Sequence, residues 1–147
     1  MAHSRSNPIR RDNLGFLLAK ASQHWNELLA AKFKDAGFGH VRPSYGSLLV
    51  PLFEEDGLRL GELARRTRLS KQTMTTMVRL LEREKLVLCR PDPEDARATR
   101  VYLSPQARRF RPVAGCVLAD LERTVREENS IRETETVRAW LKRFSGL

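Results

Sequence analysis

Long apolar runs are missing from this sequence of 147 residues, and that absence limits where the protein can work. No stretch reaches the roughly 18 consecutive apolar residues of a membrane-spanning helix. Residues 1–13, MAHSRSNPIRRDN, also lack the apolar centre of a secretory signal peptide. No segment combines a basic helical face with large exposed apolar residues, as a membrane-surface helix would. We therefore expect a cytoplasmic protein that neither spans nor lies on a membrane.

Cysteine and histidine are scarce, which argues against metal sites, disulfides and most catalytic chemistry. The two cysteines, Cys89 and Cys116, have no metal-type spacing and no histidine near them in the sequence, so we expect reduced thiols packed inside the fold. None of the three histidines, His3, His24 and His40, has a catalytic or metal-ligand spacing. A glycine-rich phosphate loop is absent as well. The sequence therefore predicts no enzyme, no metal and no cofactor.

Positive charge, by contrast, is abundant. The 27 Lys and Arg residues outnumber the 18 Asp and Glu residues, which gives a formal net charge of +9. Residues 60–108 hold 11 basic against 6 acidic side chains, whereas residues 1–59 and 109–147 each hold 8 against 6. The excess therefore concentrates in the middle of the chain, as expected if that part approaches a polyanion such as nucleic acid.

This basic segment begins with the pattern of a helix-turn-helix. Gly61–Thr67 predicts a short helix and Arg68–Leu69 a turn, while Ser70 can cap a second helix by accepting a hydrogen bond from a free backbone N–H. Apolar side chains recur at helical spacing on one face of the second helix, where they would pack against the preceding helices. These side chains are Met74, Met77, Val78 and Leu81.

The start and the opposite face of the second helix carry side chains that can hydrogen-bond to bases and phosphates. They are Ser70, Lys71, Gln72, Thr73, Thr75, Thr76 and Arg79. A simple solvated face is the alternative, because polar residues occupy such faces in most helices. However, no acidic residue occurs between Lys71 and Leu81, a bias that a solvated face does not need. We therefore expect this face to approach nucleic acid.

A β-hairpin is predicted directly after the second helix. Leu86–Arg90 and Thr99–Ser104 have the pattern of two short strands, and the intervening PDPEDARA contains the prolines and aspartates that favour a chain reversal. Such a hairpin beside a helix-turn-helix is a wing, and Arg97 would lie near its tip.

The sequence DPEDARATRVYLSPQAR resembles the wing signature of the MarR-type transcriptional regulators, in which an Asp-x-Arg element precedes a strand ending in Leu-Thr or Leu-Ser. Asp95 and Arg97 match that element. The resemblance implies that Asp95 supports the wing and that Arg97 enters the minor groove of DNA beside the second helix. The chain departs from the family pattern where Ala96 replaces a second wing arginine and where Lys85 and Ala107 replace glycines.

The resemblance also implies a fold for the whole chain: mostly α, a winged helix-turn-helix with a two-stranded β-wing and an N- plus C-terminal helical dimerisation region. The expected division is an N-terminal dimerisation helix at 12–43, the DNA-binding region at 44–104 and C-terminal dimerisation helices at 105–147. The family pairs through its first and last helices. A homodimer is therefore expected, with two winged regions on two half-sites.

Local signals place the helix ends within this architecture. Asp12 can cap a first helix over residues 13–36. A second helix starting at Ser44 contains Pro51, which should bend or end it near Val50. Pro105 suits the first turn of a long helix that reaches Glu128, with a bend at Pro112. A last helix should then span residues 131–144, where Val137, Trp140, Leu141 and Phe144 form an apolar stripe.

Relatives of the MarR type bind small aromatic or phenolic anions in a crevice between the dimer helices and the winged region. By that resemblance, a ligand site could involve Trp25, His24, His40, Arg42 and Tyr45. The alternative is that Trp25 belongs to the core and that both histidines are ordinary surface or capping residues. Some relatives sense oxidants through cysteine, but neither Cys89 nor Cys116 has the surroundings that favour a thiolate.

Together these features predict a homodimeric, sequence-specific regulator that binds double-stranded DNA at a pseudo-palindromic operator, most simply as a repressor. A winged domain that packages chromosomes without sequence preference, or that binds RNA, is the alternative, because positive charge alone does not separate them. Aromatic residues make up 7% of the chain, and none lies on the polar face of the second helix. That composition argues against RNA, which is bound largely by base stacking on aromatic side chains.

Overall fold

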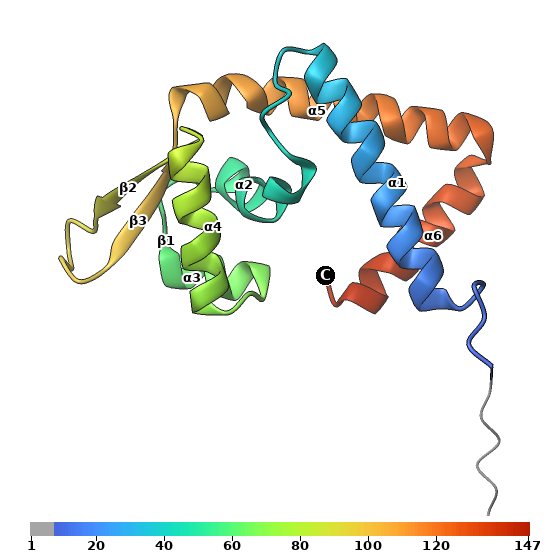
Figure 1. Ribbon diagram of the computed structural model, residues 1–147, viewed down its shortest axis with the longest axis horizontal. Coiled ribbons are helices and arrows are strands. Elements are labelled where there is room, and N and C mark those ends of the chain that lie inside the picture. Colours follow the sequence, from blue (N-terminus) through green and yellow to red (C-terminus); the bar gives the residue numbers. More distant parts are fainter. Residues whose placement is uncertain (1–7) are drawn as a thin grey trace, which may run out of the picture.

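The structure is a computed structural model that describes residues 8–147. In this part of the chain, helices dominate and a small antiparallel sheet is inserted among them (Figure 1). The elements in chain order are α1 (Leu14–Asp35), the short 3-10 helix η1 (Pro43–Tyr45), α2 (Gly46–Glu54), β1 (Leu58–Arg59), α3 (Leu60–Thr67), α4 (Lys71–Arg83), β2 (Val87–Pro91), β3 (Thr99–Leu103), α5 (Pro105–Glu128) and α6 (Ile131–Ser145).

Asn13, and not Asp12, caps α1, so the predicted cap was wrong by one residue. The Asn13 side-chain oxygen accepts a hydrogen bond of 3.0 Å from the Phe16 backbone N–H. Its extended backbone, with φ −67° and ψ 147°, brings the amide over the free N–H groups of the first turn. Asp12 instead pairs with the Arg10 side chain at 3.0 Å. Gly37 follows the helix with φ +87°, a conformation that glycine adopts without steric cost.

Pro51 lies inside α2 and does not end it, so of the two predicted outcomes, a bend or an end near Val50, the end was wrong. The helix continues to Glu54, and the Glu55 N–H still donates to the Pro51 carbonyl at 2.9 Å. Packing supplies the reason, because Leu48, Leu49 and Leu52 of α2 are all buried. This apolar burial offsets the backbone hydrogen bond that the proline removes.

The sheet has three strands in the order β1-β3-β2, whereas the sequence predicted two. Leu58 and Arg59 of β1 pair with Val101 and Arg100 of β3. A two-residue strand has no periodicity to recognise, and its partner lies more than 40 residues away, so local sequence patterns could not predict it. The approach of the β1 turn to β3 requires Gly57, because a Cβ there would lie 2.6 Å from the Tyr102 ring.

Helix α5 ends at Glu128, as predicted, and α6 continues one residue past its predicted end, to Ser145. Pro105 occupies the first turn of α5, and the Ser104 Oγ accepts a 3.1 Å hydrogen bond from the Ala107 N–H. Pro112 remains within α5. Figure 1 shows α5 leading away from the sheet and α6 turning back beside α1. No helix in residues 8–147 has both the length and the apolar character needed to cross a membrane.

The core joins the DNA-binding elements to the start of α5. Its fully buried side chains come mainly from α2, α3, α4 and the sheet, and they include Leu48, Leu63, Met74, Leu81 and Val101. The core extends to α1 and α5 through Phe33 and Phe110, whose rings meet edge to face with centroids 4.9 Å apart. In contrast, no side chain of α6 is fully buried within residues 8–147.

Candidate nucleic-acid interface

Helix α4 is held firmly at its start and along one face. The Ser70 Oγ accepts a 3.1 Å hydrogen bond from the Thr73 N–H, as the sequence predicted for the cap. On the inner face, Met74 and Leu81 are fully buried and Val78 is nearly so. Met77 is half-buried against the same core. The apolar stripe predicted from helical spacing is therefore confirmed, and the opposite face of α4 must point outward.

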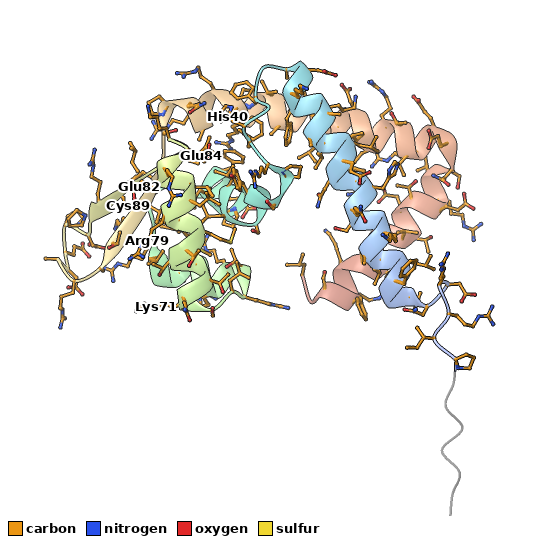
Figure 2. All side chains as sticks on the ribbon, in the orientation of Figure 1. His40, Lys71, Arg79, Glu82, Glu84 and Cys89 are labelled. Atoms are coloured by element: carbon orange, nitrogen blue, oxygen red, sulfur yellow. The ribbon has the colours of Figure 1, made fainter. Side chains whose placement is uncertain are left out.

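The polar face of α4 is accessible. Lys71, Gln72, Thr73, Thr76 and Arg79 are exposed, and Thr75 is half-buried. Figure 2 shows Lys71 at the start of α4 and Arg79 two turns further along.

The threonine hydroxyls of this face are partly engaged within the helix. The Thr75 hydroxyl donates to the Lys71 carbonyl at 2.8 Å, and the Thr76 hydroxyl donates to the Gln72 carbonyl at 3.1 Å. Because each hydroxyl proton is used in this way, the threonines offer an oxygen acceptor and a methyl group to a ligand. Lys71, Gln72 and Arg79 supply the hydrogen-bond donors. The face thus combines donors and acceptors, as base edges require.

The end of α4 sets the direction of the wing. Lys85 has a left-handed backbone with φ 59°, which costs a non-glycine residue about 1 kcal/mol. The Leu86 N–H donates to the Leu81 carbonyl and the Lys85 N–H to the Glu82 carbonyl, at 2.9 and 3.0 Å. These two bonds close the helix end and lead the chain directly into β2.

At the tip of the wing, Asp95 organises the backbone and leaves Arg97 exposed. The Asp95 Oδ1 accepts hydrogen bonds from the Arg97 backbone N–H at 3.0 Å and from the Arg97 Nε at 3.3 Å. The Arg97 side chain is 93% exposed, so solvent or a ligand can reach nearly all of it. The geometry therefore presents a cation at the point of the wing.

Asp92 joins the base of the wing together, a role that the sequence analysis missed. Its side chain is fully buried, and its Oδ2 accepts from the Arg59 Nε at 2.6 Å and the Arg100 Nε at 2.8 Å. The Oδ1 accepts from the Glu94 backbone N–H at 2.8 Å. Arg100 also donates to the Gly57 carbonyl at 2.8 Å. One carboxylate thus connects β1, β3 and the turn of the wing.

The charge of this buried carboxylate is strongly stabilised. The pKa of Asp92 is lowered from its ordinary 3.8 to about 2, first by the Glu94 N–H and then by the hydrogen bonds from Arg59 and Arg100, which outweigh the opposing effect of burial. The hydrogen bond to Glu94, two residues on, is a turn pattern that a sequence can suggest. The arginine partners come from tertiary structure, because Arg59 lies 33 residues before Asp92.

An open groove of about 630 Å³ separates the wing from the starts of α3 and α4. Basic side chains on its walls come from β1, α4 and the wing: Arg59, Lys71 and Arg97. Glu62 also lines the groove, and its pKa is lowered to about 2 by hydrogen bonds from Arg65 and Arg66. The groove is therefore a channel between two elements that can both contact DNA.

The five residues predicted for a small-ligand site do not meet at one cavity. Tyr45 is buried in the core, and Trp25 is half-buried against it. His24 is exposed on α1, and the His40 Nε2 contacts the Gln106 side chain (Figure 2). Arg42 alone of the five lines a cavity of about 330 Å³ between α1, α2 and α5.

This cavity is largely apolar. The residues around it are Leu29, Phe33, Val41, Arg42, Pro43, Gly46, Leu49, Val50, Phe53, Phe110, Arg111, Ala114, Gly115 and Leu118. Arg42 and Arg111 are its two charged residues, and both are exposed. The sequence analysis missed Arg111, because nothing in the local pattern of α5 distinguishes it from the neighbouring arginines.

The two cysteines differ in their surroundings. Cys89 is half-buried, and its pKa is raised by burial and by the nearby Glu82 (Figure 2), which agrees with the expected inert thiol. Cys116 is exposed, so the prediction that both thiols are packed inside the fold was wrong for this residue. Cys116 lies on the outer face of α5, which explains why it is exposed whereas Cys89 is half-buried. Residues 8–147 contain no cluster of three side chains suited to a metal ion, and His3 lies outside the described residues.

Residues 43–99 match the model of the MarR family, which covers the helix-turn-helix and most of the wing. A probable transcriptional regulator from Pseudomonas aeruginosa is 28% identical over 90% of this chain and 97% of its own, with a TM-score of 0.73. No curated protein sequence matches the chain.

Two further solved structures share the fold at lower identity. The S. aureus MepR–DNA complex is 20% identical over 91% of this chain and 96% of its own, with a TM-score of 0.76. PcaV from Streptomyces coelicolor, in complex with its natural ligand, is 18% identical over 95% and 97%, also with a TM-score of 0.76. Residues 43–99 thus match the MarR family, and the described chain shares the winged-helix fold of solved MarR-family transcriptional regulators.

Proposed function

We propose that the protein is a homodimeric repressor that binds a pseudo-palindromic operator in double-stranded DNA and releases it in response to a small ligand in the cytoplasm. In this proposal residues 12–43 and 105–147 form the dimer, and residues 44–104 bind DNA. The single observation that carries the proposal is the apolar stripe of α6, none of whose residues is fully buried within residues 8–147.

The stripe is large for an exposed surface. Val137 is 54% exposed, Phe144 is 70% exposed, and the Trp140 and Phe144 rings stack with centroids 5.1 Å apart. Helix α1 exposes further apolar side chains, which are Leu14, Phe16, Leu17 and Leu28. Contiguous apolar surface of this kind usually marks an interface. A second copy of the chain is the simplest partner, because its α1 and α6 offer the same exposed surface.

A dimer gives each DNA-binding region one half-site. The polar face of α4 would enter the major groove, where Gln72 and Arg79 can contact bases and Lys71 can contact phosphate. Arg97 would enter the adjacent minor groove, whose narrow A·T-rich form attracts cations. The MepR structure, a DNA complex with the same fold, supports this arrangement. Repression needs nothing more than occupation of a promoter by the dimer.

The cavity between α1, α2 and α5 supports a response to a small aromatic or phenolic anion. Its walls are mostly apolar, and the exposed guanidinium groups of Arg42 and Arg111 can pair with a carboxylate or phenolate. About 330 Å³ suits a molecule of one or two rings. Because the cavity lies between the DNA-binding elements and the long helices, an occupant could change the angle between them. The PcaV structure, which holds a natural ligand, lends support.

Recovery of bound fragments from the protein's own genome tests the DNA-binding part of the proposal. The fragments should share a short inverted repeat, and the dimer should prefer that repeat over random duplex by about a hundredfold or more at moderate salt. Affinity should fall steeply with added salt, because counterions are released from the phosphates. Equal affinity for random duplex would support a chromosome-packaging role instead.

A thermal-shift screen of benzoates, cinnamates and phenols tests the ligand part. A compound that stabilises the protein should also lower its affinity for the operator. Arg111→Gln and Arg42→Gln should weaken the effect, whereas Arg109→Gln should not, since Arg109 is an exposed α5 arginine that does not line the cavity. If all three variants respond like the wild type, the ligand binds elsewhere.

A further inference from the structure

Arg68, at the turn between α3 and α4, is hydrogen-bonded to the end of α6. Its Nη1 donates to the Ser145 carbonyl at 2.9 Å, and its Nη2 donates to the Gly146 carbonyl at 2.7 Å. Within residues 8–147, no other hydrogen bond or salt bridge connects residues 60–104 with α6. Figure 1 shows the chain end returning to the side of the molecule where α3 meets α4.

The backbone is unusual on both sides of this contact. Arg68 has φ 55°, a left-handed conformation that is unfavourable for a residue with a side chain. Gly146 also has a positive φ, of 71°. A Cβ on residue 146 would lie 2.9 Å from the Arg68 Nη1 and 3.1 Å from its Nη2. A side chain at residue 146 would therefore push the guanidinium away from the two carbonyls it binds.

The chemistry of the contact suits a lasting link. The last carbonyls of an α-helix have no partners inside the helix and carry the negative end of its dipole. A guanidinium is a planar fork with several N–H donors, and it can bind two such oxygens at once. A lysine ammonium also carries several N–H donors, but they lack the rigid planar spacing of the guanidinium.

The contact lies where it can restrict the orientation of α4. The DNA-binding region joins α5 covalently at Ser104, at the end of the sheet. Arg68 lies beyond the other end of this region, and Ser70, the cap of α4, follows two residues later. The shared core also packs this region against the long helices, and the contact at its far end adds a second point that restricts its angle. The far end here is the start of α4, which carries Lys71 and Gln72.

We propose that Arg68 is a positioning residue for DNA recognition. By holding the end of α6, it fixes the angle of residues 60–104, the part of the DNA-binding region from α3 to the end of the wing, relative to the long helices. The consequence for operator binding rests on the proposed homodimer, because that angle then sets the separation of the two α4 helices. A fixed separation restricts the protein to operators with one spacing between half-sites.

The angle can be measured within one chain by spin-label distances. The labels are placed at Ala96→Cys on the wing and Glu128→Cys at the end of α5, with Cys89→Ser and Cys116→Ser. Labelled protein is diluted in an excess of unlabelled protein, so that only the distance within one chain is seen. Arg68→Gly and Gly146→Ala should each broaden the distance distribution. Arg65→Gln is the matched control, because it removes a neighbouring arginine that bonds only to Glu62 of its own helix.

Arg68→Gly and Gly146→Ala act on opposite sides of the same contact, and Gly146→Ala leaves the charge unchanged. Distributions as narrow as that of the wild type in both variants would overturn the proposal. Because both labels are on one chain, the experiment remains decisive even if the protein proves to be monomeric and the proposed function fails.

Operator spacing supplies the functional readout. Affinity is measured for the recovered operator and for versions with one base pair inserted or removed at its centre. Arg68→Gly and Gly146→Ala should each reduce the preference for the natural spacing by about threefold or more. Both should keep the preference for the natural bases within each half-site. A different result would be that Arg68→Gly weakens operator affinity and its salt dependence, whereas Gly146→Ala does not, and that neither variant changes the spacing preference. Arg68 would then be a phosphate contact, and the proposal would be wrong.

Discussion

Asp92 and Arg100 are joined across the base of the wing, where the Arg100 Nε donates a 2.8 Å hydrogen bond to the Asp92 Oδ2. The same oxygen accepts from Arg59 of β1, so two guanidinium groups meet at one buried carboxylate. Arg97, at the tip of the wing, follows Asp92 by five residues in the chain. The direction in which the wing presents its exposed arginine therefore depends on a residue that DNA need not touch.

Asp92→Asn should destabilise the protein and weaken DNA binding, because a neutral amide pairs poorly with two guanidinium groups. The effect should depend on pH in a defined direction. The folded-state pKa of about 2 lies below the ordinary value of 3.8, so the carboxylate stabilises the fold fully above about pH 4. That stabilisation is lost as the pH falls through 2. Urea unfolding between pH 2 and 6 should therefore show a steeper acid loss for wild type than for Asp92→Asn.

Asp120→Asn is the control for this prediction, since Asp120 is a partly exposed carboxylate that pairs with Arg123 on its own helix. It should follow the wild-type pH profile. Equal pH profiles for Asp92→Asn and the wild type would show that the buried carboxylate does not hold the wing.

Gln72→Ala and Thr76→Ala should relax the choice among operator bases. Each lost base contact of good geometry is worth about 1 to 3 kcal/mol of discrimination. Binding to a set of operators, each with one half-site base pair changed, would measure the loss as a smaller spread of affinities. If every operator in the set weakens equally, these side chains contact the DNA backbone and not the bases.

Arg97→Ala should weaken binding to all operators and leave most of the base preference intact. The exposed guanidinium acts through charge in the minor groove, so any lost selectivity should be confined to A·T-rich flanks. Titrations at several salt concentrations provide the measurement, with Arg123→Ala on α5 as a control of equal charge. Unchanged affinity at every salt concentration would remove the wing from the DNA interface.

Cys89 should react slowly with thiol reagents at neutral pH. Its raised pKa, due first to burial and then to Glu82, leaves less of the reactive thiolate than an ordinary cysteine has. In a Cys116→Ser background, the rate at which Cys89 is modified should begin to rise only at a pH above the usual pKa range of a cysteine thiol. Glu82→Gln should move this rise toward lower pH, because it removes a negative charge beside the sulfur. A fast reaction at neutral pH would instead favour an oxidant sensor.

Truncation before Val137 should abolish dimerisation and operator binding, giving monomers or insoluble protein. The removed stripe is expected to contribute to an interface on the order of 2,000 Å² or more, the size of a permanent dimer. Sedimentation measures the assembly state directly. Phe144→Gln is a milder variant, since this ring is 70% exposed in the single chain and its loss should leave the subunit folded. A truncated form that stays dimeric and binds operator normally would place dimerisation elsewhere.

The sequence alone determined the features that depend on neighbours along the chain. Ser70 caps α4 where the pattern predicted, and Pro105 begins α5 as predicted, because a helix start depends on residues only a few positions apart in the chain. The inner face of α4 followed from helical periodicity, and the wing followed from turn residues between two short strands. The Asp-x-Arg element of Asp95 and Arg97 could also be recognised from the sequence, because its hydrogen bonds join residues only two positions apart.

Tertiary structure decided the contacts between distant residues. Arg59 reaches Asp92 across 33 residues, and Arg68 reaches Ser145 across 77, and neither pairing leaves a periodic or local trace in the sequence. The third strand, the cavity beside Arg111 and the persistence of α2 past Pro51 likewise depend on which surfaces pack together. Local sequence rules assign each residue by its intrinsic propensity for helix, strand or turn. The free energy of burial and of contacts with distant residues can be several times larger than that propensity. The exposed polar face of α4 was therefore predictable from the chain, whereas the contacts between distant residues around it arise only in the folded molecule.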